Sequence, residues 1–151
     1  MRHGDISARD AVEVTPVHLA AGYPSATRQP GAASGLDLVN AMLKEKPEAV
    51  AWTTSEGKTP LFGALKNGEE VIKALSSPEV MNVQTIEEGW TVLHTACMEH
   101  NLSAIETLLA QNADANLQDK KRRSPLFHLL VKPPRADDAA RHAELVSVLR
   151  Q

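Results

Sequence analysis

Aromatic residues are scarce in this sequence. They make up 3% of its 151 residues, whereas hydrophobic residues as a whole make up 42%. The strands of a β-sandwich favour aromatic and β-branched side chains, so this composition argues against that class of fold. The core must instead be built from aliphatic side chains and alanine. We therefore expect closely packed helices.

Cysteine, long apolar runs and a large net charge are lacking as well. Cys97 is the single cysteine, so no internal disulfide can form, and nothing suggests an oxidising compartment. No apolar run approaches the roughly 18 residues of a membrane span, and the first residues are not followed by a signal-peptide core. The net charge of −3 is too small to indicate a nucleic-acid or membrane surface. These absences predict an intracellular protein, cytoplasmic or nuclear, that is not bound to a membrane.

The sequence does contain an internal repeat. The tetrapeptide Thr91–His94 returns 33 residues later as Ser124–Phe127, and a similar one, Thr59–Phe62, lies 32 residues before it. A fourth, Thr15–His18, precedes Thr59 by 44 residues. A threonine hydroxyl can cap a helix, and a proline after it lacks the amide that would otherwise be unpaired. Each tetrapeptide therefore predicts the start of a helix, and the near-constant spacing predicts a repeat architecture.

Each tetrapeptide is followed by a second stretch with a helical apolar stripe. In the third repeat, Leu102, Ile105 and Leu108 fall on one helix face, and Asn112 then stands where a left-handed residue is needed. We expect Pro47 to end the second helix of the first repeat. The predicted organisation is a lead-in at 1–9 and units at 10–53, 54–85, 86–118 and 119–151, with insertions at 22–35 and 132–136, the last unit stopping before its pattern is complete.

The four units resemble the ankyrin repeat family. Unit three matches best, with Thr91–His94 and Asn112–Asn116 in the family's positions and spacing. Phe62 and Phe127 depart from the family's histidine, and Arg122 stands where a hairpin glycine is usual. The resemblance implies an all-α solenoid of four helix-turn-helix repeats, whose hairpin loops project from one side and whose first helices line a concave face.

The resemblance also implies a non-enzymatic protein that binds a protein partner through this concave face, as a scaffold or adaptor. The expected contact residues run from acidic in the third hairpin to basic in the fourth, which predicts a partner of mixed charge. They lie on the hairpins and on the turns after the first helices: Ser55, Glu56, Lys58, Lys66, Asn67, Glu87, Glu88, Trp90, Met98, Glu99, Lys120, Lys121 and Arg123.

The two tryptophans are interpreted differently. Trp90 directly precedes Thr91, where it either anchors a partner or packs on the next hairpin. Trp52 follows a predicted second helix, so we expect it to pack against the stack.

A set formed by His94, Cys97 and His100 has the look of a metal site on a helix. Residues three and six apart cannot all converge on one ion from a straight helix, and no fourth ligand is evident. The repeat explains the set more simply, with His94 and His18 bonding neighbouring backbone and Cys97 buried. No Ser/His/Asp or Cys/His set is placed for catalysis. We therefore expect no metal, no cofactor and no small-molecule substrate.

Two alternatives remain at this stage. The chain stops at Gln151 without the polar outer face of a terminal repeat, which suggests a regulatory ankyrin segment of a larger enzyme or channel. The basic run 120–123 is a less favoured candidate for nuclear targeting or nucleic-acid binding. The sequence does not tell the oligomeric state.

Overall fold

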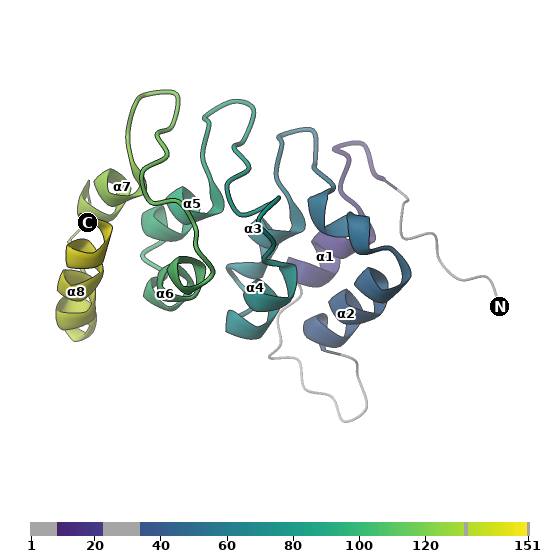
Figure 1. Ribbon diagram of the computed structural model, residues 1–151, viewed down its shortest axis with the longest axis horizontal. Coiled ribbons are helices and arrows are strands. Elements are labelled where there is room, and N and C mark those ends of the chain that lie inside the picture. The colour runs from purple at the N-terminus through teal and green to yellow at the C-terminus, as the bar shows by residue number, and fades with distance from the viewer. Residues whose placement is uncertain (1–8, 23–33, 132, 151) are drawn as a thin grey trace.

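The computed structural model describes residues 9–22, 34–131 and 133–150. Within these ranges every regular element is helical, which confirms the all-α prediction (Figure 1). The elements are α1 (Pro16–Gly22), α2 (Gly35–Glu45), η1 (Pro47–Ala51), α3 (Pro60–Ala64), α4 (Glu69–Leu75), α5 (Val92–Met98), α6 (Leu102–Ala110), α7 (Pro125–Val131), η2 (Ala136–Asp138) and α8 (Ala139–Leu149), where η marks a 3₁₀-helix.

The α-helices stack in two rows. Helix α1 packs on α3, α3 on α5 and α5 on α7, while α2, α4, α6 and α8 form the second row in the same way. Figure 1 shows the loops that precede α3, α5 and α7 projecting together from one side of the stack. Each unit predicted from the sequence holds one helix of each row. The exact unit boundaries stay our interpretation.

The tetrapeptides begin the first-row helices, as expected. Thr91 is the N-cap of α5, where its side chain accepts a hydrogen bond from the His94 amide. Thr59 is the N-cap of α3, with Pro60 at the first helical position. At the end of α6, Asn112 has a φ of 66°, the left-handed conformation that its place in the sequence predicted.

The ends of the two insertions differ from the prediction. Gly22 is the last residue of α1, and Gly35 is the first of α2, so both belong to helices rather than to a loop. The rest of this insertion, 23–33, lies outside the described residues. Ser34 caps α2 through reciprocal hydrogen bonds with Asp37, a pairing that was not predicted although its Ser-x-x-Asp signature is present in the sequence.

Two further boundaries also need correction. Helix α2 ends at Glu45, and Pro47 then opens η1 instead of only ending the helix. Proline suits the first position of a helix because its missing amide would have been unpaired there. Ala136, assigned to the second insertion, is the first residue of η2.

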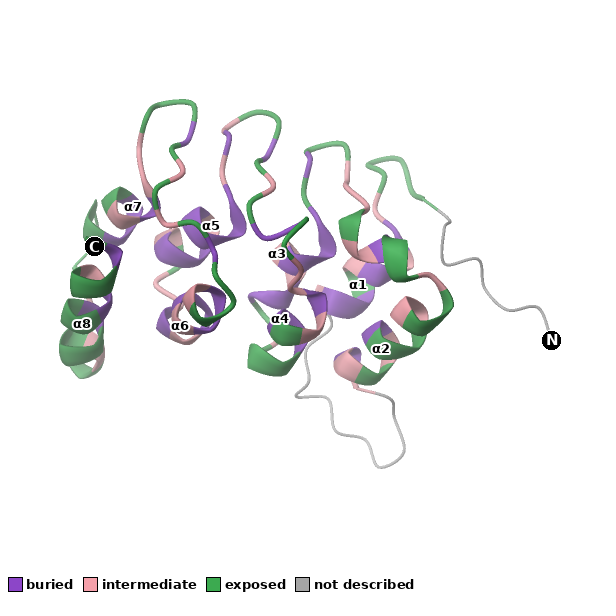
Figure 2. Ribbon diagram, in the orientation of Figure 1, coloured by how far each residue is buried: buried purple, intermediate pink, exposed green. Residues whose placement is uncertain are grey.

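The core is aliphatic and lies between the two helix rows. Leu61 and Leu93, the third residues of their tetrapeptides, are fully buried, and Leu126 of the fourth unit packs partly buried against the same cluster. Second-row helices contribute Ile72 and Ile105. Figure 2 shows that α8, at one end of the stack, is largely exposed.

The loops before the first-row helices are hairpins that share one backbone feature. Two residues before each Thr or Ser of the tetrapeptide, the chain takes a left-handed conformation: φ is 60° at Glu13, 79° at Gly57, 72° at Gly89 and 60° at Arg122. Glycine adopts this conformation without strain. Arg122 therefore does stand in a glycine position, and Glu13 is a second such substitution.

Backbone hydrogen bonds join successive hairpins into one row. The carbonyl of Val12 accepts from the Ser55 amide at 3.1 Å, that of Glu56 from the Ile86 amide at 2.9 Å, and that of Glu88 from the Lys120 amide at 3.0 Å. In each case the accepting carbonyl belongs to the third residue before the tetrapeptide. This ladder holds the hairpins in register.

Candidate functional site

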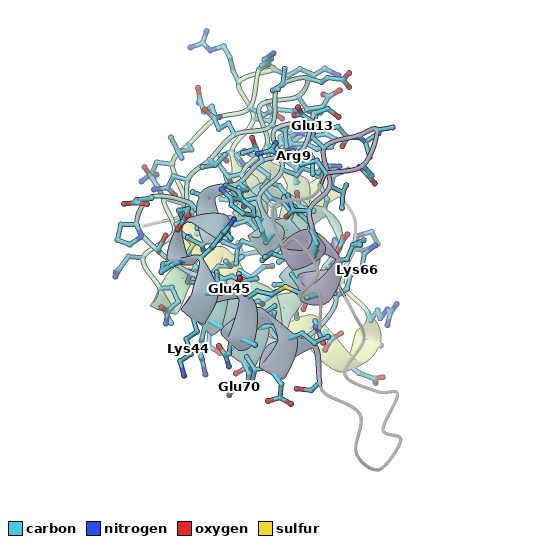
Figure 3. All side chains as sticks on the ribbon, turned by 90° about the vertical axis from the view of Figure 1, so that its right-hand side faces the viewer. Arg9, Glu13, Lys44, Glu45, Lys66 and Glu70 are labelled. Carbon is cyan, nitrogen blue, oxygen red and sulfur yellow. The ribbon has the colours of Figure 1, made fainter. Side chains whose placement is uncertain are left out.

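The candidate site is the face predicted to bind a partner, here called the inner face. It comprises the hairpins 54–58, 86–90 and 119–123 and the turns that follow α3 and α5. Figure 3 looks along the stack and shows Lys66, in one of these turns, on the opposite side from Lys44 and Glu45 of α2. The outer face carried by α2 therefore provides a natural comparison surface.

Two histidines, the buried His94 and the partly buried His18, hold the hairpins in place. The Nε2 atom of His94 lies 3.0 Å from the carbonyl oxygen of Arg123, in the following hairpin, and its Nδ1 lies 2.8 Å from the Thr91 hydroxyl. His18 repeats this arrangement, with Nε2 3.0 Å from the Lys58 carbonyl. Burial lowers the pKa of both imidazoles. Both histidines are thus engaged by neighbouring backbone, as the repeat interpretation expected.

Unit two lacks this histidine. Phe62 occupies its position, and the buried Thr59 hydroxyl has no hydrogen-bond partner. The substitution therefore leaves a polar group uncompensated in the middle of the stack.

The thiol of Cys97 is fully buried in α5. Burial raises its pKa to about 12, so the reactive thiolate is strongly disfavoured. Within the described ranges, no group of three or more His, Cys, Asp or Glu side chains is placed to hold a metal ion.

The fourth hairpin is built around a buried carboxylate. Asp119 accepts hydrogen bonds from the Lys121 and Arg123 amides and from the Arg123 guanidinium, each at 2.9 Å, and lies 3.1 Å from His128 Nε2. Burial by itself raises the pKa of the Asp119 carboxyl, but these bonds outweigh it and hold the pKa well below its usual range. Asp119 is not among the residues predicted from the sequence, because nothing in the motif marks it as buried.

Asp119 divides the basic run into two kinds of residue. Arg123 is held in the ion pair with Asp119, and Lys120 donates a hydrogen bond from its ammonium to the Ile86 carbonyl. Lys121 and Arg122 are exposed. Two of the four cations therefore hold the hairpin while two face solvent.

Trp90 packs on the next unit. It is partly buried, and its ring stands edge-on to His128 of α7, with ring centroids 6.3 Å apart. Of the two interpretations of this residue, the structure supports packing, and the indole nitrogen of the ring is buried. Trp52 is also partly buried and packs against the core, as expected.

Three of the predicted contact residues meet at a surface pocket of about 840 Å³. Lys66 follows α3, and Met98 and Glu99 end α5. The segment after α7 forms the third side of the pocket, and the sequence had indicated this segment only as an insertion. The other lining residues, none of them predicted, are Leu65, His100, Asn101, Leu102, Pro133, Pro134, Arg135 and Asp138.

The remaining predicted residues are spread over the hairpins. Ser55, Glu56 and Lys58 are exposed, with Glu56 and Lys58 forming an ion pair. Glu87 is exposed and Glu88 is half-buried. Asn67 has a structural contact, since its amide donates to the Ala21 carbonyl at 3.0 Å.

The sequence of the chain is similar to a known family of proteins. The model of a family described as ankyrin repeats (3 copies) matches residues 31–131, about two thirds of the chain, and takes in α2 to α7. No curated protein matches the sequence. None of the helices in the described residues is both long enough and apolar enough to span a membrane.

Proposed function

Because the chain belongs to the ankyrin repeat family, whose repeats are generally protein–protein interaction modules, we propose that it binds a protein partner through its inner face. The observation that carries this proposal is the pocket, at which predicted contact residues from two units and an insertion from a third converge. Concave sites lined by apolar side chains and a few polar groups are the usual form of a binding pocket, and this pocket has both kinds of lining in similar measure.

The charges around the pocket favour a partner of mixed charge. Lys66 and Arg135 contribute cations, while Glu99 and Asp138 contribute carboxylates. The exposed hairpin residues follow a similar pattern, with Glu87 in the third hairpin and Lys121 in the fourth. Complementary charges on a partner would set its register along the inner face and raise its association rate.

The inner face is also suited to binding with little ordering cost. The hairpin ladder and the buried histidines fix the backbone before any partner arrives. Binding energy is then not consumed in ordering the loops. We propose no chemistry for the chain itself, since ankyrin repeat proteins are typically non-enzymatic and the Cys97 thiol is buried. The free, buried thiol also supports our proposal that the protein acts inside the cell.

The proposal is tested by affinity capture with matched charge-swap variants. The pocket variant Lys66→Glu/Glu99→Lys and the outer-face variant Lys44→Glu/Glu45→Lys both leave the net charge unchanged, and all four side chains are exposed. We expect the wild type and the outer-face variant to capture the same partner, and the pocket variant to lose at least about tenfold in affinity, or about 1.4 kcal/mol. Equal retention by the pocket variant, or equal loss by the outer-face variant, would refute the inner-face assignment.

A further inference from the structure

The two ends of the stack expose apolar side chains at positions that are covered inside it. The third residue after the end of each tetrapeptide is buried in units one to three, where it is Ala21, Leu65 and Cys97. In unit four the same position is Leu130, which is 55% exposed on α7. Phe127, the residue that corresponds to His94, is also exposed. These positions are the ones over which a following unit packs.

The opposite end shows the complementary feature. The residue directly after each tetrapeptide faces the preceding unit. In unit two this residue is Gly63, and a Cβ atom added to it would lie 3.3 Å from the His18 carbonyl oxygen of unit one. In unit four it is His128, whose ring centroid lies 5.6 Å from that of His94 in unit three. In the first unit this position is Leu19, which is 66% exposed. Leu19 therefore stands where an inner unit contacts its predecessor.

The hairpins at the two ends carry the groups that would continue the ladder. In the last hairpin, the carbonyl of Lys121 is equivalent to the carbonyls of Val12 and Glu88, which accept hydrogen bonds from the following hairpin. In the first hairpin, the amide of Ala11 is equivalent to the amides of Ser55 and Lys120, which donate hydrogen bonds to the preceding hairpin. Within the described residues neither group makes a backbone hydrogen bond.

The charges at the two ends are also complementary. Arg122 in the last hairpin and Glu13 in the first are both exposed and both occupy the left-handed position, although Glu13 also pairs with Arg9 at 3.7 Å. Stacking one end on the other would place these equivalent positions in neighbouring hairpins. An opposite-charge pair at such a contact favours this pairing over the association of two like ends.

We propose that the chain associates head to tail with a second copy, the unit-four end of one copy stacking on the unit-one end of the other. The contact continues the interface already present between successive units, with Leu19 packing against Phe127 and Leu130. It is heterologous, so each added copy leaves one end free, and the assembly grows with concentration.

The experiment uses two variants of the 151-residue chain that each block one end, Leu19→Glu and Leu130→Glu. Both side chains are exposed, so circular dichroism should show an unchanged helical content. In sedimentation velocity the wild type is expected to gain mean mass as its concentration rises, while each variant alone stays at the 16.3 kDa of the monomer. An equimolar mixture of the two variants is expected to form a dimer and nothing larger. The intact unit-four end of Leu19→Glu can stack on the intact unit-one end of Leu130→Glu, and both ends that remain free in the dimer are blocked.

The control is Ile86→Glu, which removes an exposed apolar side chain from a hairpin in the middle of the stack. It should associate as the wild type does. A wild type that stays monomeric, a single end variant that still dimerises, a mixture that stays monomeric, or a loss of association in the control would each overturn the proposal.

Discussion

A single position in the tetrapeptide decides how firmly each unit is tied to the next. Where it is histidine, as in His18 and His94, the ring connects a threonine hydroxyl to a carbonyl of the following hairpin. Where it is Phe62, the Thr59 hydroxyl has no partner. The sequence showed this difference, but only the structure shows which atoms depend on it.

Changing His94 to phenylalanine should reproduce the defect of unit two. We expect His94→Phe to lower the free energy of unfolding by about 1 to 3 kcal/mol, since it removes the ring's hydrogen bonds to the buried Thr91 hydroxyl and to the Arg123 carbonyl. Urea denaturation measures the change. The control is Phe127→His, at the same position of the last unit, where no further hairpin of the same chain is in contact. At protein concentrations at which the chain is monomeric, its effect should stay within about 0.5 kcal/mol. Equal effects of the two variants would show that the histidine contacts do not stabilise the stack.

His18 and His94 also predict how the free energy of unfolding depends on pH. Burial lowers the pKa of His18 and His94 below the ordinary value of 6.5, so the unfolded chain binds protons that the folded chain does not. The free energy of unfolding should therefore fall as pH drops from about 7 to about 5. Carboxyl groups with a lowered pKa, such as that of Glu106, whose ordinary value is 4.5, add their loss only at lower pH.

Urea denaturation at several pH values measures this dependence. The double variant His18→Phe/His94→Phe should show a flatter dependence over the same window, although it is less stable throughout. A variant as steep as the wild type would assign the pH dependence to other groups.

Among the elements, the first and fourth hairpins have strained backbone at a non-glycine residue. Arg122 and Glu13 take left-handed conformations that favour glycine, as at Gly57 and Gly89. Asp119 compensates in the fourth hairpin by fixing the loop from inside through Arg123. This hairpin is therefore held by side chains where the second and third can rely on glycine.

Relieving the strain in the fourth hairpin should stabilise the protein. We expect Arg122→Gly to raise the free energy of unfolding by about 0.5 to 1 kcal/mol. The neighbouring Lys121→Gly serves as the control, because Lys121 has no left-handed conformation to relieve and a glycine there only adds freedom to the unfolded chain. Thermal unfolding compares the two, and a decrease for both variants would show that the conformation of Arg122 is not strained.

The elements were predictable where a local pattern specifies them. Tetrapeptides and apolar stripes placed the first-row and second-row helices, and Asn112 marked a left-handed turn that the structure contains. Burial of Asp119 and packing of Trp90 on His128 depend on which units become neighbours, so no local pattern indicates them. The pocket was predictable only in part: Lys66, Met98 and Glu99 follow from the repeat register, but its third wall depends on how the segment after α7 folds.

At the scale of the whole molecule, the main helix contacts between units in the described residues join neighbouring units, so the stack is built by repeating one interface. That interface joins backbone to backbone at the hairpins and aliphatic side chains between the helix rows. The result is an extended surface whose shape is fixed by the repeat and whose side chains are free to vary. We propose recognition by the inner face as the functional consequence of this division.

The most direct test of that consequence is site-specific photo-crosslinking in the complex with the captured partner. A photoreactive residue is placed either at Met98, in the pocket, or at Lys44, on the outer face. Our account predicts that the partner cross-links from position 98 and not from position 44. Cross-linking from position 44 alone would contradict recognition through the inner face.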